Sequence, residues 1–426
     1  MRAWPRGGLW RHPDFLRLWS AQTISQFGSQ ISALALPLAA ILVLDASAFE
    51  VALLGTVEFL PFLLFALPAG VWVDRLRRKP ILVVADVIRA GLLASIPLVY
   101  AFDALTMWQL YLVGFGTGVC TVFFDVAYQS YLPSLVERAS LVEGNSKLEV
   151  SRSGAQLAGP GLAGLLVGAI TAPYAILADA VSFVASAVLV LRIRGTEILP
   201  ERTGRPSMRM ELGEGLRYLL GHRFWRPIAI TVAISNFFST LTFSIFLVYL
   251  ARDLELSAQV IGVVLAVSNV GWLLGAVGAN RVSNRLGVGP TLVGAPLLFG
   301  PGLLLIPAAP QSQPIPFIVG GLILATFGGI VFNVTGLSFQ QAVVPDRMLG
   351  RLNATRRFIV WGVIPLGSFT GGVLASQIGL RETLWAGAIG GTLSFIPLLI
   401  SPVRSLGPME DAVREYSEIA MATGDA

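Results

Sequence analysis

The chain has 426 residues, of which 54% are hydrophobic and only 13% are charged. Soluble proteins carry roughly 25% charged residues, so this composition excludes an ordinary soluble globular domain. The formal net charge of +5 does not indicate a nucleic-acid partner, because the basic residues are scattered over many short segments and form no single basic face. The single cysteine, Cys120, excludes disulfides and cysteine metal sites.

Apolar runs long enough to cross a bilayer recur along the whole sequence. A spanning helix needs about 20 mostly apolar residues, and in hydrocarbon the backbone must satisfy its own hydrogen bonds, which favours helices. We therefore predict an all-α polytopic membrane protein with twelve transmembrane helices in two pseudo-symmetric six-helix halves. The first run is too long for a cleavable signal peptide, so we expect it to remain as the first span. The predicted spans are 14–44, 48–73, 80–101, 107–131, 147–170, 173–192, 226–251, 257–280, 290–309, 315–341, 355–377 and 382–403.

The positive charges predict the orientation of these spans. Of the 30 Lys and Arg residues, only Arg252 and Arg381 lie in loops after odd-numbered spans, and Arg89 lies near the middle of a span. Cytoplasmic segments of membrane proteins carry an excess of Lys and Arg. We therefore expect a multi-pass protein of the plasma (inner) membrane with both termini in the cytoplasm.

A basic motif between the second and third spans has a weaker copy half a chain later. The two stretches are Gly70-Val-Trp-Val-Asp74-Arg75-Leu-Arg-Arg78-Lys79-Pro80 and Asn280-Arg-Val-Ser-Asn284-Arg285-Leu-Gly-Val-Gly-Pro290. A repeat over this distance predicts two homologous halves. The expected divisions are a half over 1–192, a cytoplasmic linker over 193–225, a half over 226–404 and a cytoplasmic tail over 405–426.

The linker and the tail both show helical patterns. In the linker, apolar residues at 208, 212, 216, 219 and 220 follow Ser207, a suitable N-cap, and predict an amphipathic helix along the cytoplasmic interface. In the tail, Met409, Val413 and Tyr416 share one helical face opposite acidic residues, which predicts a short helix.

Polar side chains form stripes at helical spacing on the first, fourth, seventh and tenth spans. These spans hold equivalent places in successive three-helix units, so we expect the stripes to line one shared cavity near the bilayer midplane. The alternative is ordinary hydrogen bonding between packed helices. Aromatic residues beside the stripes suit an amphipathic ligand, and no cluster of basic residues favours polyanions. The candidate cavity residues are Gln26, Gln30, Thr121, Tyr128, Asn236, Phe237, Asn333 and Trp361.

Carboxylates inside a membrane are costly and therefore functional candidates. Glu58 lies midway along the second span with no basic residue within a helical turn, so it is the first candidate for reversible protonation. Asp179 is the second candidate, with a structural hydrogen bond to Ser182 as the alternative. Asp86 and Arg89 are three residues apart on one helix and can neutralise each other, so we interpret them as structural.

Twelve spans in two halves with G-x-x-x-D-R-x-x-R-[RK] between the second and third spans resemble the major facilitator superfamily. Four further stretches are similar to its exporter branch, which includes macrolide and siderophore efflux pumps. They are Phe15-Leu-Arg-Leu-Trp19, Gln26-Phe-Gly28, Leu60-Pro61-Phe62 and Gly144-Asn145-Ser146.

The resemblance implies a conformational latch formed by Gly70, Asp74, Arg75, Arg78 and Asp125. In similar transporters the aspartate lies at the N-terminal end of the eleventh helix, where the helix dipole favours a negative charge, and Arg78 would pair with Asp125. We expect these contacts to stabilise an outward-open state. The alternative for the basic residues is a topology signal alone. The second half lacks the charged residues of the motif, so the latch is expected on one half only.

The fifth span contains Ala155-x-x-x-Gly159-Pro160-x-x-Ala163-Gly164, which resembles the antiporter motif G-x-x-x-G-P-x-x-G-G. Small residues let helices approach closely, and Pro160 removes a backbone donor. Ordinary small-residue packing is the alternative interpretation of Gly159, Pro160 and Gly164. Related antiporters often carry an arginine in the fourth span where this chain has Leu112, so a mechanism that depends on that arginine does not transfer.

These features together predict a secondary transporter that exports a small amphipathic compound, such as a drug, macrolide or siderophore-like molecule, by proton antiport with alternating access. An importer or facilitator of a small solute and a non-transporting membrane sensor are the alternatives. Motifs of intramembrane enzymes and of ATP-driven pumps are absent from the sequence, so we expect no enzyme activity, cofactor or metal. The expected partners are the substrate, protons and membrane lipid, with no nucleic acid, and the protein is expected to be a monomer.

Overall fold

The computed structural model describes residues 8–73, 76–137, 140–195, 213, 216–217, 219–344 and 346–423. This part of the chain is helical and contains no strand. It includes 11 helical stretches that are long and apolar enough to cross a membrane. The helices are α1 (Pro13–Leu42), α2 (Ala48–Val73), α3 (Arg78–Tyr100), α4 (Met107–Leu135), α5 (Leu141–Ile170), α6 (Ala172–Leu191), α8 (Trp225–Val248), α9 (Ala258–Ser268), α10 (Val270–Leu286), α11 (Val288–Gly294), α12 (Pro296–Ala308), α13 (Pro314–Val343), α14 (Asp346–Ile378), α15 (Leu380–Leu393), α16 (Ile396–Leu399) and α17 (Met409–Thr423).

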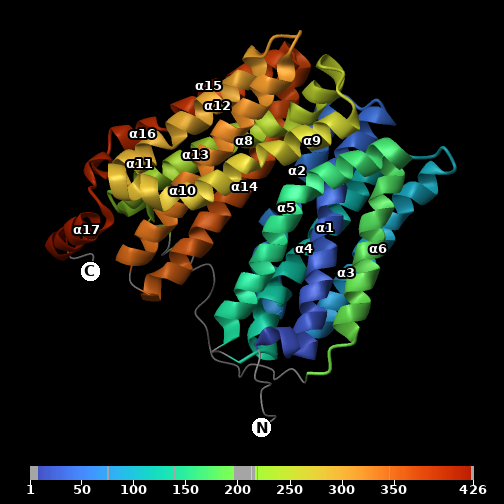
Figure 1. Cartoon of the computed structure of the whole chain (residues 1–426), viewed down its shortest axis with the longest axis horizontal. Coiled ribbons are helices and arrows are strands. Elements are labelled where there is room, and N and C mark those ends of the chain that lie inside the picture. Colours follow the sequence, from blue (N-terminus) through green and yellow to red (C-terminus); the bar gives the residue numbers. More distant parts are fainter. Residues whose placement is uncertain are drawn as a thin grey trace. The chain divides into compact units, whose positions relative to one another are not determined.

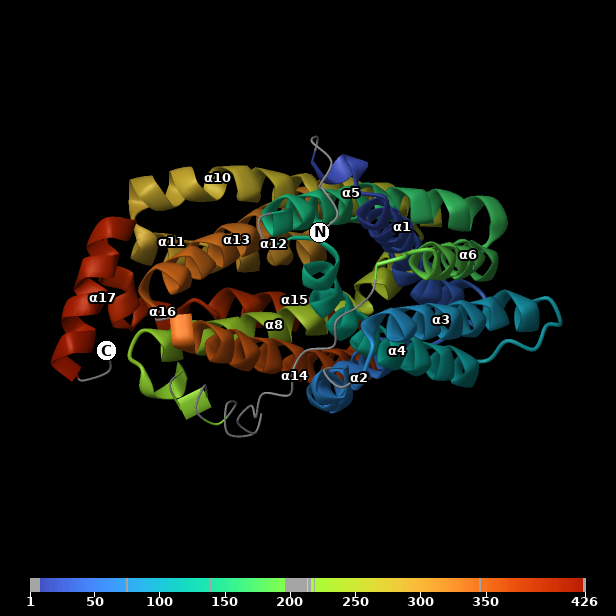
Figure 2. The same ribbon diagram turned by 90° about the horizontal axis from the view of Figure 1, so that it is seen from below.

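The chain divides into two compact units (Figure 1). The first unit contains Met1–Gly204 and Leu250–Ala266, and the second contains Arg205–Tyr249 and Val267–Ala426. In the first unit α1 packs against α5 and α6, α3 packs against α4 and α6, and α2 packs against α4. In the second unit α8 packs against α14 and α15, α12 against α13 and α15, and α10 against α13 (Figure 2). The same order of pairings therefore occurs in both units.

The predicted last span, 382–403, is not one continuous helix. Helix α15 ends at Leu393, and α16 covers only Ile396–Leu399. The Ser394 hydroxyl donates to the Gly391 carbonyl oxygen at 2.6 Å, and such back-bonding bends helices. Pro397, which follows, has no N–H to continue the helix. The stretches 257–280 and 290–309 are likewise interrupted, the second directly before Pro296.

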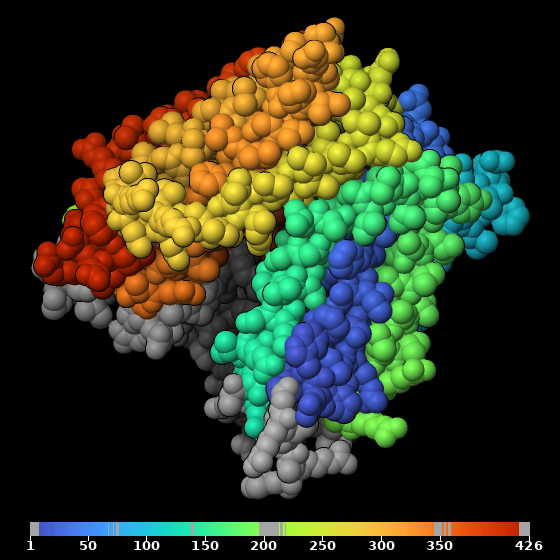
Figure 3. All heavy atoms as spheres, in the orientation of Figure 1, coloured from blue at the N-terminus to red at the C-terminus, as the bar shows by residue number. Residues whose placement is uncertain are grey.

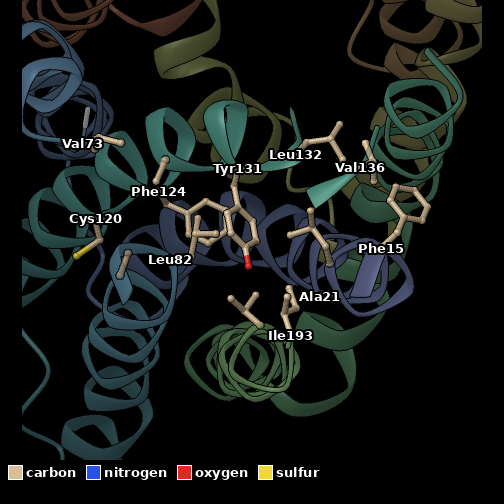
Figure 4. Close-up of a cluster of buried hydrophobic side chains, with 14 of the residues drawn as sticks. Phe15, Ala21, Val73, Leu82, Cys120, Phe124, Tyr131, Leu132, Val136 and Ile193 are labelled. Atoms are coloured by element: carbon tan, nitrogen blue, oxygen red, sulfur yellow. The ribbon is translucent and has the colours of Figure 1, made fainter. Parts of the chain in front are cut away.

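Large apolar side chains fill one end of the first unit (Figure 4). Phe15 of α1, Leu82 of α3, Tyr131 of α4 and Ile193 beyond α6 are at most 2% exposed and belong to one buried cluster. The Nζ of Lys79 fixes this end by donating to the carbonyl oxygens of Leu191 at 2.9 Å and Ile193 at 2.7 Å. A basic group at the last carbonyls of a helix is favourable, so Lys79 stabilises the end of α6.

The tail forms the predicted helix, α17, and it packs on the second unit. The buried Tyr416 ring stacks on His222 with 5.1 Å between centroids, and the Nε1 of Trp225 donates to its Oη at 3.4 Å. Figure 3 shows the atoms of α17, in red, against the yellow atoms of α10 and α11. Of the predicted linker helix, positions 208 and 212 lie outside the described residues. Leu216, Leu219 and Leu220 are described and helical, and only Leu219 of these is buried.

Backbone hydrogen bonds connect the start of α11 to the segment before α17. The N–H of Val288 donates to the carbonyl oxygen of Gly407 at 2.8 Å, and the N–H of Gly289 donates to that of Leu406 at 3.0 Å. A Cβ on Gly289 would lie 2.2 Å from the Val403 carbonyl oxygen, so no larger residue fits there. This is the region of the second, weaker copy of the basic motif.

Arg252 and Arg381, the two arginines predicted to lie in loops after odd-numbered spans, both have partners. Arg252 donates to a carboxylate oxygen of Asp45 at 2.6 Å within the first unit. In the second unit, Arg381 donates to the carbonyl oxygens of Pro307 at 2.8 Å and Ala309 at 3.4 Å, at the end of α12. Each charge therefore has a local structural role.

Candidate functional site

A cavity of about 370 Å³ lies inside the second unit, between α8, α12, α13 and α14. Ligand-binding cavities are roughly 300–1,000 Å³ and mostly apolar, with a few polar groups that fix orientation. This cavity has that composition. Its wall includes Trp225, Ser235, Asn236, Phe299, Phe332, Asn333, Gln340, Arg356 and Trp361.

Of the candidate cavity residues in the second half, Asn236, Asn333 and Trp361 line this cavity, whereas Phe237 is not among its lining residues. The Asn236 Nδ2 donates to the Val232 carbonyl oxygen at 2.8 Å, which holds the amide against its own helix. Phe237 instead packs edge-to-face on Phe238 with 5.2 Å between ring centroids.

The candidate cavity residues of the first half make contacts within the first unit. A Cβ on Gly159 would lie 2.4 Å from the Cβ of Gln30, so this glutamine packs directly on α5. The Thr121 hydroxyl donates to the Thr117 carbonyl oxygen at 2.8 Å. The rings of Tyr128 and Phe124 stack with 6.2 Å between centroids. Gln26 is half-buried on α1.

Arg356 lines the cavity and was not among the residues predicted for it. By sequence it counts only as one of several cytoplasmic charges at the start of a span. The spacing of Leu352, Arg356, Ile359 and Val360 is i, i+4, i+7 and i+8, and all four line the cavity. That spacing is the signal that could have placed Arg356 on the inner face of α14.

Glu58 lies where α2 meets α4. A Cβ on Gly114 would lie 3.0 Å from the Glu58 Cγ, and a Cβ on Gly118 would lie 2.5 Å from the Glu58 carbonyl oxygen. These glycines therefore allow the close approach that places the carboxyl group between the helices. Among the described residues, none forms a hydrogen bond or an ion pair with the Glu58 carboxyl group.

Asp179 is buried in α6 and has a hydrogen-bond partner. The Ser182 hydroxyl donates to the Asp179 Oδ1 at 2.9 Å, which confirms the predicted hydrogen bond. A Cβ on Gly28 would lie 2.4 Å from that oxygen and 2.2 Å from the Ser182 Oγ. Gly28 is therefore required for the close contact of α1 with α6 at Asp179.

Asp86 and Arg89 form the predicted pair on α3, and both are buried. The Arg89 guanidinium also lies 4.3 Å from the ring centroid of Phe124 and 4.1 Å from that of Phe183. These contacts compensate the charge in an apolar bundle. Within the part of the chain that the structure describes, no three His, Cys, Asp or Glu side chains are placed to share a metal ion.

The predicted latch is described only in part. Asp74 and Arg75 lie outside the described residues, so their contacts stay a prediction. Gly70 is half-buried near the end of α2, and Arg78 is buried in the first turn of α3. Asp125 is half-buried on α4, which packs along α3.

Pro160 and Gly164 of the antiporter-like motif lie where α5 meets α9 in the first unit, whereas Gly159 faces Gln30 of α1. A Cβ on Gly164 would lie 2.5 Å from the Ala258 carbonyl oxygen and 2.8 Å from the Gly262 Cα. A Cβ on Gly262 would lie 2.6 Å from the Pro160 carbonyl oxygen. Gly164 and Gly262 therefore permit a backbone contact that no other residue allows.

Residues 9–421 match the model of a family described as transmembrane secretion effector, a branch of the major facilitator superfamily. The chain belongs to the major facilitator superfamily. The protein is accordingly a multi-pass membrane transporter, and its apolar helices are the spans of this fold.

Curated relatives in this superfamily cover most of the chain. The multidrug efflux pump Tap of Mycolicibacterium fortuitum is 27% identical over 395 residues, which cover 88% of this chain and 92% of the relative. The macrolide efflux protein A of Streptococcus pyogenes is 23% identical and covers 91% of this chain and 95% of the relative.

Solved structures share the superfamily fold at low sequence identity. A bacterial homologue of the iron transporter ferroportin in an inward-facing state matches with a TM-score of 0.74 and 17% identity, covering 91% of this chain and 98% of the other. The nucleoside transporter NupG matches with a TM-score of 0.68 and 14% identity, covering 91% of this chain and 97% of the other. At these identities the likeness extends to the fold alone.

Proposed function

We propose that this transporter exports a small amphipathic compound, such as a drug, macrolide or siderophore-like molecule, in exchange for protons. The relatives named as multidrug and macrolide efflux pumps support export. The cavity of about 370 Å³ with aromatic and amide side chains supports an amphipathic substrate, because it offers both apolar surface and a few hydrogen-bonding groups.

The observation that carries proton coupling is the position of Glu58. The carboxyl group lies between α2 and α4 without a partner among the described residues. An ionised carboxylate in such surroundings is costly, whereas the protonated form is tolerated. Glu58 is therefore our first site of proton exchange. Asp179 is the second, although its bond to Ser182 also supports a structural role.

Alternating access requires two halves that rock about a central site. We assign these halves to 1–192 and 226–404, with twelve spans, both termini in the cytoplasm, and the plasma (inner) membrane as the location. The recurrence of the same helix pairings in both units supports the repeat. We further propose that the protein works as a monomer in contact with lipid.

Two groups of residues are proposed to control the conformational change. The latch of Gly70, Asp74, Arg75, Arg78 and Asp125 would stabilise the outward-open state. The close contacts of α5, with α1 at Gly159 and with α9 at Pro160 and Gly164, would keep the packed helices closed to leakage; the backbone approach at Gly164 supports this role.

The test is transport into inside-out vesicles with an acidic interior. Macrolides, siderophores and dye-like cations serve as the panel, and wild type is compared with Glu58→Gln. Glu149→Gln, an equal change of charge at an exposed position of α5, is the control. We expect gradient-dependent accumulation in wild type and in the control, and its loss in Glu58→Gln.

The alternatives give different results in the same vesicles. Accumulation that survives in Glu58→Gln would keep the exporter and move proton coupling to Asp179 or Asp125. Flux that only equilibrates the compound, with or without a proton gradient, would indicate an importer or facilitator. Binding without any flux would indicate a sensor.

A further inference from the structure

Arg356 gives the cavity of the second unit a positive charge. Among the described residues that line the cavity, Arg356 alone is charged, and no Asp or Glu faces it there. A cavity with apolar walls strengthens the field of such a group, because little water screens it. The cavity therefore favours anionic over cationic ligands.

The Arg356 guanidinium has no partner within the described part of the chain. No described residue forms a hydrogen bond, an ion pair or a ring contact with it. Arg89 in the first unit, in contrast, pairs with Asp86 and lies over two aromatic rings. A guanidinium has five N–H donors, so a ligand can take the donors of Arg356 without breaking a bond to any described residue.

The rest of the wall suits the apolar part of an amphipathic ligand. Trp225, Phe299, Phe332 and Trp361 supply aromatic surface, and the Asn333 amide supplies a further hydrogen-bonding group. A guanidinium recognises planar or tetrahedral oxyanions through paired N–H···O bonds. The wall thus combines an anion-binding group with an aromatic surface.

We propose that the transported compound is an amphipathic anion whose carboxylate or phosphate group pairs with Arg356 while its aromatic or apolar body packs on Trp225, Phe332 and Trp361. This inference rests on the proposed export function and narrows its substrate class. An anionic lipid headgroup offers the same chemistry as such a compound, so the experiment must separate the two sources.

The test uses the full-length protein in nanodiscs of phosphatidylcholine, with binding measured by isothermal titration calorimetry. The probes are 1-naphthaleneacetic acid and 1-naphthaleneacetamide, which share a ring and differ in charge. We expect the acid to bind about tenfold more tightly, as befits a charge-assisted hydrogen bond. Arg356→Gln should lower the affinity for the acid to that for the amide. Arg356→Lys should retain part of the preference for the acid.

Arg404→Gln is the matched control, because Arg404 is exposed and outside the cavity. It should leave the preference for the acid unchanged. Equal affinity of acid and amide for wild type would overturn the proposal, and so would a preference that survives in Arg356→Gln.

Nanodiscs that also contain phosphatidylglycerol separate compound from lipid. Two results together would show that Arg356 binds a lipid headgroup: phosphatidylglycerol abolishes binding of the acid, and native mass spectrometry finds this lipid retained by wild type but not by Arg356→Gln. The assignment of the site to a transported anion would then be wrong. Undiminished binding of the acid supports a soluble anion.

The vesicle assay distinguishes failure of this inference from failure of the proposed function. Gradient-dependent export of neutral or cationic compounds that is unchanged in Arg356→Gln would refute the anionic substrate while the exporter stands. Acid-selective binding that depends on Arg356, without flux of any compound, would refute the exporter while the anion site stands.

Discussion

Gly164 of α5 and Gly262 of α9 meet backbone to backbone, so that a Cβ on Gly164 would lie 2.8 Å from the Gly262 Cα. Gly164→Ala should therefore push the two helices apart and lower the stability of the protein by about 1–3 kcal/mol, the usual cost of overpacking. Thermal unfolding in detergent measures the loss.

Gly161→Ala is the control for this prediction. A Cβ on Gly161 would meet only the Ala266 Cβ, at 3.5 Å, which is an ordinary contact. Equal melting temperatures for Gly164→Ala and Gly161→Ala would show that the backbone contact is not required.

The pair of Asp86 and Arg89 should be far more sensitive to loss of one partner than to loss of both. Asp86→Asn leaves the buried guanidinium without its carboxylate partner and should destabilise the protein by about 3–5 kcal/mol. The double variant Asp86→Asn with Arg89→Met should recover much of that loss. A double variant that is less stable than Asp86→Asn would contradict a purely structural role for the pair.

Lys79 should protect the end of α6. Lys79→Met removes the donor to the carbonyl oxygens of Leu191 and Ile193 and should speed amide hydrogen exchange over the last turn of α6. The stability lost is small, about 0.3–1 kcal/mol. Arg77→Met removes an equal charge from the same segment at an exposed position, so it controls for membrane topology. If amide hydrogen exchange at the end of α6 is equally fast in Lys79→Met and Arg77→Met, Lys79 does not stabilise the helix end and acts only as a topology signal.

Tyr416 should hold the tail helix on the second unit. Tyr416→Ala removes a ring that packs on His222 and Trp225 and should weaken docking of α17 by about 3–5 kcal/mol. A glutamate-specific protease should then cleave within the tail, at Glu410 or Glu415.

Tyr416→Phe provides the matched comparison, because it keeps the ring and removes only the hydroxyl bonded to Trp225. Its cost should be about 0.5–1.5 kcal/mol, and its tail should resist the protease. Equal cleavage of wild type and Tyr416→Ala would mean that other contacts hold α17.

Features set by local spacing were predictable from the sequence. The Asp179–Ser182 hydrogen bond and the Asp86–Arg89 pair each join residues three apart on one helix, and helix geometry alone brings them together. The tail helix follows from its amphipathic pattern in the same way.

Contacts between distant helices were not predictable. The smallness of Gly114 can be seen in the sequence, but nothing there indicates that it faces Glu58. Gln30 was predicted to line a cavity and packs on Gly159, because a polar stripe looks alike whether it faces a helix or a cavity. Arg356 was missed for the opposite reason: a charge at the end of a span satisfies the topology rule and so needs no other explanation.

The main-chain bonds of Val288 and Gly289 to residues 406–407 explain why the second copy of the basic motif is hard to recognise. A loop that is held by contacts of charged side chains must keep those side chains, whereas a loop that is held by main-chain hydrogen bonds accepts almost any residue that fits. The only sequence requirement is then for a small residue where space is limited, as at Gly289. The other residues of the second loop can therefore change while the loop keeps its backbone conformation. It also closes late during synthesis, since its bonds cannot form until the chain through Gly407 has been made.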